Sequence, residues 1–119
     1  YAIAQLIDRL THGNRTQVQF CQRGEPYPMP TMLGMNLLRI AQEALTNALK
    51  YSQATAIAIQ IDYDRDRIAL TIQDDGCGFV LADEQGGFGI VSMYQRAERI
   101  NGELQILSQP KQGTIVKVQ

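Results

Sequence analysis

The spacing of apolar residues predicts two helices and a short strand in the first half of the chain. Apolar positions recur at helical spacing over residues 2–12, and polar and apolar residues alternate over 17–22 as in a half-buried strand. From Thr31, a residue type that favours the helix N-cap, to Tyr51 the helical period is unbroken. This is the strongest helix pattern in the sequence.

After Ser52 the period of the apolar positions changes from 3.6 to 2. A hairpin of two strands is expected over 57–61 and 68–72, with the turn at 62–66. A helix over 90–100, closed by Asn101-Gly102, precedes strands at 104–106 and 115–118. Together these elements predict an α+β two-layer sandwich, with helices packed on one face of a mixed, mostly antiparallel sheet.

Length and composition agree with one globular domain over residues 1–119. The 45% hydrophobic and 19% charged residues are typical of a soluble folded protein. The net charge of −1 argues against a chain that coats nucleic acid or an anionic membrane. Cys21 and Cys77 stand far apart, which predicts no zinc site and no redox pair but a reducing, cytoplasmic compartment. The chain starts on Tyr1 within an element, so we expect a piece of a longer protein.

A polar stripe follows one side of the long helix. Arg39, Glu43, Asn47 and Lys50 project on roughly the same face, opposite the Leu and Ala residues. An amide oxygen such as that of Asn47 suits magnesium, and Lys50 has the charge to meet phosphate. A solvated helix face with an i,i+4 hydrogen bond is the alternative interpretation.

Two glycine-rich segments are further candidates for ligand contact. The segment Asp74-Asp75-Gly76-Cys77-Gly78 follows a buried strand, and its carboxylate can accept a hydrogen bond from a base amine. Gly86-Gly87-Phe88-Gly89 opens a helix, whose free amides and dipole favour phosphate. Taken alone, the first also fits a tight polar turn and the second a flexible connection.

His12 is the only histidine in the chain. A single histidine excludes a His-rich metal site, and no Ser-His-Asp arrangement is evident. We expect His12 at the exposed end of the first helix.

Taken in order, these motifs resemble the ATP-binding catalytic domain of sensor histidine kinases. The resemblance runs from about Ala2 to Gln119 and is strongest to kinases that pair with LuxR/NarL-type response regulators. It implies the Bergerat-type fold of the superfamily shared with DNA gyrase, the heat-shock chaperone ATPase and MutL. The segments that carry it are residues 38–50 as the N box, Asp74-x-Gly76-x-Gly78-Phe79 and Gly87-x-Gly89-Ile90 as the glycine boxes, Met93, Arg96-Ala97, and Gly113-Thr114.

The resemblance also implies roles for individual residues. Asn47 would coordinate Mg²⁺, Asp74 would receive the adenine amine, and Glu43 holds the acidic position that polarises water in the ATPase relatives. Tyr51 and Phe88 stand where histidine is frequent in this subfamily. The remaining implied contacts are Gly76, Gly78, Phe79 and Thr114 around the base, and Lys50, Tyr51, Gly87, Phe88, Gly89 and Ile90 near the phosphates.

The implied function is to bind Mg-ATP and to donate its γ-phosphoryl group to a histidine. By the resemblance, that histidine lies on a separate dimerisation domain of the parent protein, and this domain is expected to be absent from the chain. The response regulator is expected to interact through the parent protein. We therefore expect no self-phosphorylation, no nucleic-acid contact and no membrane contact by this domain, although the parent is free to be membrane-anchored. An anti-sigma-type serine kinase and a nucleotide-binding interaction module without catalysis are the alternatives. Met93, Arg96-Ala97 and Gly102 favour the histidine kinase over the first, and intact Asn47, Asp74 and glycines count against loss of nucleotide.

Overall fold

The computed structural model describes residues 2–12, 16–26, 28–50, 55–65, 67–76, 90–108 and 114–118. Helices and strands alternate irregularly along this part of the chain. In order they are α1 (Ala2–Thr11), β1 (Gln17–Arg23), α2 (Thr31–Lys50), β2 (Ala56–Tyr63), β3 (Ile68–Asp74), α3 (Ile90–Arg99), β4 (Leu104–Ser108) and β5 (Thr114–Val118).

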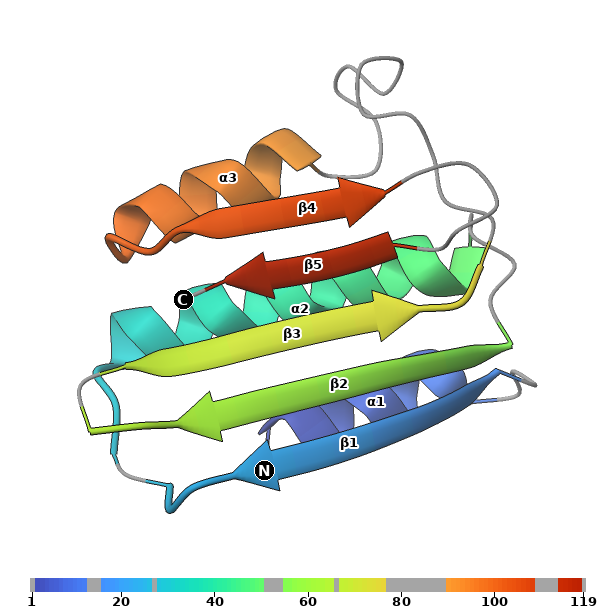
Figure 1. Ribbon diagram of the computed structural model, residues 1–119, viewed down its shortest axis with the longest axis horizontal. Coiled ribbons are helices and arrows are strands. Elements are labelled where there is room, and N and C mark those ends of the chain that lie inside the picture. Colours follow the sequence, from blue (N-terminus) through green and yellow to red (C-terminus); the bar gives the residue numbers. More distant parts are fainter. Residues whose placement is uncertain are drawn as a thin grey trace.

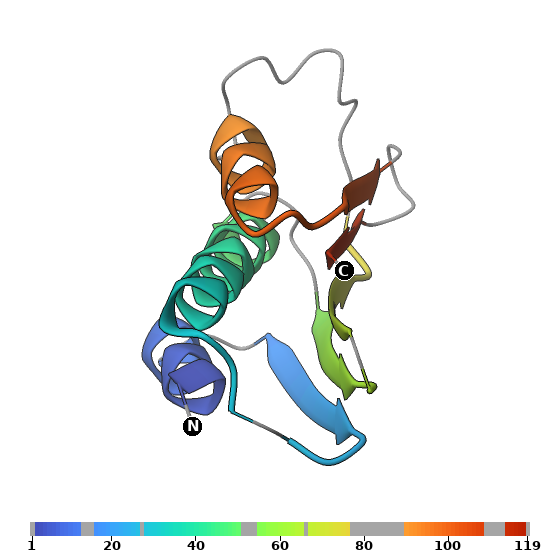
Figure 2. The same ribbon diagram turned by 90° about the vertical axis from the view of Figure 1, so that its left-hand side faces the viewer.

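The strands form one mixed sheet covered on one face by the helices. The strand order is β1-β2-β3-β5-β4, with β1 parallel to β2 and the other neighbours antiparallel. Figure 1 shows the sheet in front of the helices, and Figure 2 shows α1, α2 and α3 side by side as a second layer. The predicted α+β sandwich is confirmed.

The hydrophobic core lies between α2 and the middle of the sheet. Strand alternation sends the isoleucines of β2 and the apolar residues of β3 toward the helices, as the sequence period predicts. Each fully buried Leu or Ile contributes about 1.5–3 kcal/mol of transfer free energy. The largest fully buried side chains are Ile40 and Leu45 of α2, Ile57 and Ile59 of β2, Leu70 of β3, Met93 of α3 and Val118 of β5.

Backbone hydrogen bonds fix where α2 begins and where α3 ends. The N–H of Gly34 donates to the carbonyl of Pro30 at 3.1 Å, so Pro30 holds the cap position and the expectation of a Thr31 N-cap is wrong by one residue. α3 ends at Arg99, and the predicted Asn101-Gly102 pair closes it, with a φ of 55° at Asn101. The N–H of Gly102 then donates to the Ala97 carbonyl at 2.9 Å, which is the bond of a Schellman cap.

The β2–β3 hairpin is longer and its turn tighter than the sequence predicts. β2 continues to Tyr63, and the N–H of Asp64 donates to the carbonyl of Arg67 at 2.9 Å. Beside this end, β1 leaves the sheet at Gly24 with a φ of 79°, where an added Cβ would lie 2.1 Å from the carbonyl oxygen of Tyr63. Only glycine fits there without displacing the backbone.

The chain directions bring four element ends together at one end of the sandwich. α2 and β3 finish there, while α3 and β5 begin there, as Figure 1 shows. No helix in the described part of the chain is both long and apolar enough to cross a membrane.

Candidate nucleotide site

Four predicted site residues, one each from α2, β3, α3 and β5, lie at the element ends that meet at this end of the sandwich. Asn47 lies in the last turn of α2, and Asp74 is the last residue of β3. Ile90 is the first residue of α3, and Thr114 is the first of β5. Segments widely separated in sequence are therefore placed at one edge of the two layers.

Asp74 is a buried carboxylate held in the middle of the sheet. It is paired with Ile57 of β2 on one side and with Thr114 of β5 on the other. Because it continues the alternation of Leu70 and Ile72, its side chain lies on the helix-facing side, where it is 7% exposed. Its Oδ1 accepts the N–H of Gly76 at 2.9 Å, so the following turn fixes the orientation of the carboxylate.

Asp75, the next residue, is exposed and joins the end of β3 to the start of β2. Its carboxylate accepts the hydroxyl of Thr55 at 2.7 Å and the N–H groups of Thr55 and Ala56 at 2.9 and 3.1 Å. The hydrogen bond from the Thr55 side chain, and next that from the Ala56 backbone, lower the pKa of Asp75. Asp75 thus secures the strand end that carries Asp74.

The polar stripe of α2 becomes partly buried toward the site. Arg39 is exposed, whereas Glu43 and Asn47 are half-buried and neighbour the buried Ala44 and Leu45. The stripe is therefore not simply a solvated face. Asn47 offers an amide oxygen, which is a ligand type that magnesium accepts, so the donor chemistry at this position fits the ion.

Several predicted contacts lie outside the described residues. They are Tyr51, Gly78, Phe79, Gly87, Phe88 and Gly89, together with the side chains of Lys50, Ile90 and Thr114. His12 is exposed at the end of α1, as expected. Within the described ranges, no group of three or more His, Cys, Asp or Glu side chains is arranged to hold a metal ion.

No specific contact of Asp75 was predicted from the sequence, although the Asp74-Asp75 pair was evident there. The structural role of Asp75 depends on Thr55, which lies at the far end of the β2–β3 hairpin. In the sequence, the contact is indicated only by a threonine before the first strand of the hairpin and an aspartate after the second. This pattern is weak evidence as long as the register of the two strands is unknown.

The fold is that of histidine kinase domains. The histidine kinase domain of a blue-light activated kinase from Erythrobacter litoralis matches with a TM-score of 0.76 and 19% identity, over 98% of this chain and 61% of that one. The histidine kinase AdeS of Acinetobacter baumannii matches with a TM-score of 0.79 and 15% identity, over the same shares of the two chains. At these identities the likeness establishes the architecture alone.

The sequence assigns the family. Residues 33–119 match the model described as "Histidine kinase-, DNA gyrase B-, and HSP90-like ATPase", and the chain belongs to this family. The resemblance to sensor histidine kinases noted from the motifs is thereby confirmed.

Curated relatives are sensor proteins and sensor histidine kinases of bacteria. The nitrate/nitrite sensor protein NarX of Escherichia coli K12 is 35% identical over 78% of this chain and 16% of its own length. The sensor histidine kinase LnrJ of Bacillus subtilis is 33% identical over 99% of this chain and 29% of its own. The oxygen sensor histidine kinase NreB of Staphylococcus carnosus is 39% identical over 68% and 24%. The chain thus spans less than a third of the length of each of these proteins.

Proposed function

We propose that this domain binds Mg-ATP at the end of the sandwich where α2 and β3 finish, and donates the γ-phosphoryl group to a histidine. The acceptor is a histidine on the dimerisation domain of a longer protein that signals through a LuxR/NarL-type regulator. One observation carries the proposal most directly. The buried carboxylate of Asp74 is paired with Thr114 at the same end of the molecule as Asn47.

Asp74 is proposed to select adenine. A buried carboxylate accepts a hydrogen bond from an exocyclic amine, and burial strengthens that bond because water does not compete for it. The Gly76 N–H holds Oδ1 in a fixed direction, which lowers the entropy lost on binding. Gly76, Gly78, Phe79 and Thr114 are proposed to form the surrounding base pocket.

Asn47 is proposed to hold Mg²⁺ through its amide oxygen. The ion, when bound, supplies positive charge that neutralises the phosphate oxygens. Lys50 follows Asn47 by less than one helical turn and is proposed, with Tyr51, to contact the phosphates. Glu43 lies one turn before Asn47, and we assign to it the polarising carboxylate.

The start of α3 is proposed to bind the phosphates through the backbone. The first amides of a helix have no partner within it and present positive partial charge. Gly87, Phe88 and Gly89 immediately precede Ile90, so the glycines allow the chain to approach the phosphate oxygens closely.

The transfer itself needs an aligned acceptor. The bond between the γ-phosphorus and the bridging oxygen of ATP breaks, ADP leaves with that oxygen, and a bond to an imidazole nitrogen forms. The acceptor ring loses its N–H proton to solvent or a neighbouring base. Because the reaction depends mainly on alignment and charge, the nitrogen must come within about 3–3.5 Å of the phosphorus. His12, exposed at the end of α1, is not expected to meet this requirement.

Labelling with radioactive Mg-ATP tests the proposal. This chain alone is expected to carry no acid-labile phosphate, whereas the chain joined to its parent's dimerisation region is expected to carry it on a histidine of that region. Asn47→Ala and Asp74→Asn in the joined protein should each abolish most of the label. Acid-labile phosphate on His12 would contradict the proposal, and acid-stable phosphate on a serine would favour the serine kinase alternative.

A further inference from the structure

A groove of about 880 Å³ runs along the surface of the helical layer. All three helices contribute to it, and its lining residues on α2 lie between Thr31 and Gln42 and those on α3 between Arg96 and Arg99. This places it away from Asn47 and the proposed nucleotide site. We call it the arginine groove and define it by Arg9 of α1, Met32, Met35 and Arg39 of α2, and Arg96 and Arg99 of α3.

The arginine groove concentrates positive charge. It holds four of the chain's 11 lysines and arginines, although the net charge of the chain is −1. None of its described lining residues is acidic, and within the described ranges none of the four arginines forms an ion pair with a carboxylate. The groove therefore has an unneutralised cationic rim, which favours a ligand with acidic groups.

The groove also exposes unusual apolar surface. Met32 is 65% and Met35 62% exposed, and both lie on the side of α2 that faces away from the buried Leu37 and Ile40. Methionine side chains are flexible and adapt to apolar partners, so they are frequent at binding surfaces for peptides. Neighbouring exposed apolar residues rimmed by charge are typical of a protein contact site.

Arg96 is held in place from the inner side of the groove. Asn36, which is only 6% exposed, donates from Nδ2 to the carbonyl of Met32 at 2.8 Å. Its Oδ1 faces Nη1 of Arg96 at 3.5 Å. A guanidinium has five N–H donors, so this contact orients Arg96 across α2 and α3 while leaving other donors for a ligand.

We propose that the arginine groove docks an acidic amphipathic helix of a partner protein. Met32, Met35 and Arg39 recur along α2 at intervals of three and four residues, which matches a helix lying alongside. The methionines contact its apolar side, and the arginines pair with Asp or Glu on the flanks. This inference is independent of the nucleotide site, because it uses other residues and another part of the helical layer.

Two synthetic peptides of 16 residues test the proposal by fluorescence anisotropy. Both carry leucines at helical spacing, but one has glutamates on its flanks and the other has lysines at the same positions. We expect the glutamate peptide to bind at least about tenfold more tightly than the lysine peptide, and to bind more weakly as salt increases. Arg39→Gln with Arg99→Gln, and separately Met32→Gln with Met35→Gln, should each weaken it by about tenfold or more.

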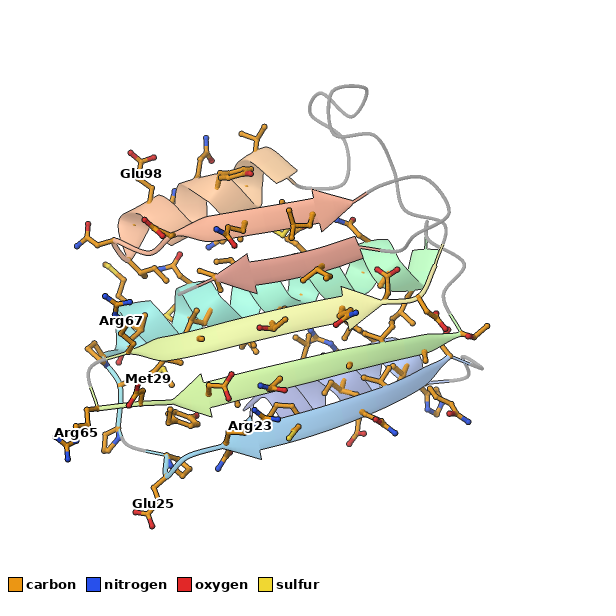
Figure 3. All side chains as sticks on the ribbon, viewed as in Figure 1. Arg23, Glu25, Met29, Arg65, Arg67 and Glu98 are labelled. Atoms are coloured by element: carbon orange, nitrogen blue, oxygen red, sulfur yellow. The ribbon has the colours of Figure 1, made fainter. Side chains whose placement is uncertain are left out.

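A matched control removes the same charge elsewhere. Arg23 at the end of β1 and Arg65 in the β2–β3 turn are exposed, and Figure 3 shows both at the end of the sheet where this turn lies. Arg23→Gln with Arg65→Gln should leave peptide binding within twofold. Thermal unfolding and ATP titration of every variant separate a folding defect, or a failure of the nucleotide proposal, from a loss of docking.

Three results would overturn the inference. The first is equal binding of the two peptides, or equal loss in the control variant. The second is self-association in sedimentation that the groove variants abolish, because the occupant is then a second copy of the chain. The third is binding to vesicles of anionic phosphatidylglycerol, lost in the groove variants, without any preference between the peptides.

Discussion

Replacing Asp74 with asparagine isolates the hydrogen bond proposed to recognise adenine. Asparagine has the same shape, and its remaining oxygen can still accept the N–H of Gly76, so the turn after β3 is retained. The other carboxylate oxygen becomes an NH₂ group, which is a donor. It then faces the adenine amine, also a donor, and the proposed bond cannot form.

The expected magnitude follows from the burial of Asp74. A hydrogen bond to a charged group is worth about 1.5–3 kcal/mol, and at 7% exposure little water is available to replace it. Since about 1.4 kcal/mol corresponds to a tenfold change in affinity, ATP should bind roughly ten to over a hundred times more weakly. GTP has a carbonyl in place of the amine, so it should bind the unmodified protein poorly and should lose little further in the variant.

Isothermal titration with ATP and GTP measures both effects. Asp75→Asn is the matched control, because it removes the same charge from an exposed neighbour that is bonded to Thr55 and Ala56. Its ATP affinity should stay within a few-fold of the unmodified protein. ATP affinity of Asp74→Asn within twofold of the unmodified protein, or an equal loss for the two nucleotides, would refute the assignment.

Three further predictions concern the metal, acid stability and the core. Asn47→Ala should remove the gain in ATP affinity that magnesium provides while preserving α2, since alanine has the higher helix propensity; an equal gain in both proteins would exclude Asn47 from the site. Folding lowers the pKa of Asp75 from 3.8. The stabilisation that this carboxylate gives the folded protein is therefore complete above pH 3.8, and it is lost as the pH falls through the lower pKa of the folded state. The free energies of unfolding of the unmodified protein and of Asp75→Asn, measured with denaturant, should therefore converge as the pH falls below 3.8. A difference between the two free energies that grows on acidification would contradict this. Leu45→Ala removes a fully buried side chain and should lower the free energy of unfolding by about 2–5 kcal/mol, measured in urea; a loss below about 1 kcal/mol would place Leu45 outside the core.

The helices and strands with a regular apolar pattern are predictable from the sequence, because each of them buries one face only. The unbroken period of α2 and the alternating isoleucines of β2 each identify an element and its inward face, and both are confirmed by burial. The Asn101-Gly102 pair also marks the end of α3 correctly, since asparagine tolerates a positive φ.

Contacts across the sheet and between helices were not predictable in the same way. Thr55 and Asp75 meet only because the hairpin register places them together, and no local pattern gives that register. Asn36 is polar yet buried, because α3 packs against α2 at this position and Arg96 faces its side chain. The helical period of α2 alone would leave Asn36 on the polar side with Arg39.

For the candidate site, the glycine spacing after a buried strand marked the Asp74-Asp75 segment as a candidate for ligand contact, and it was the resemblance to sensor histidine kinases that assigned the adenine contact to Asp74. The pairing of Asp74 with Thr114 was not deducible from spacing, because β5 joins β3 across the intervening α3 and β4. From the sequence, Asn47 was recognisable as a candidate only as part of the polar stripe of α2. The structure adds that its side chain is partly buried.

The pairing of β3 with β5 has a consequence for the order of folding. β2 with β3, and β4 with β5, are neighbours in sequence, so each hairpin closes a short loop and can form early. β3 meets β5 only when these two hairpins dock, which requires a longer loop to close. Asp74 and Thr114 come together in that docking step, so the proposed nucleotide site is completed only after the two halves of the sheet have joined.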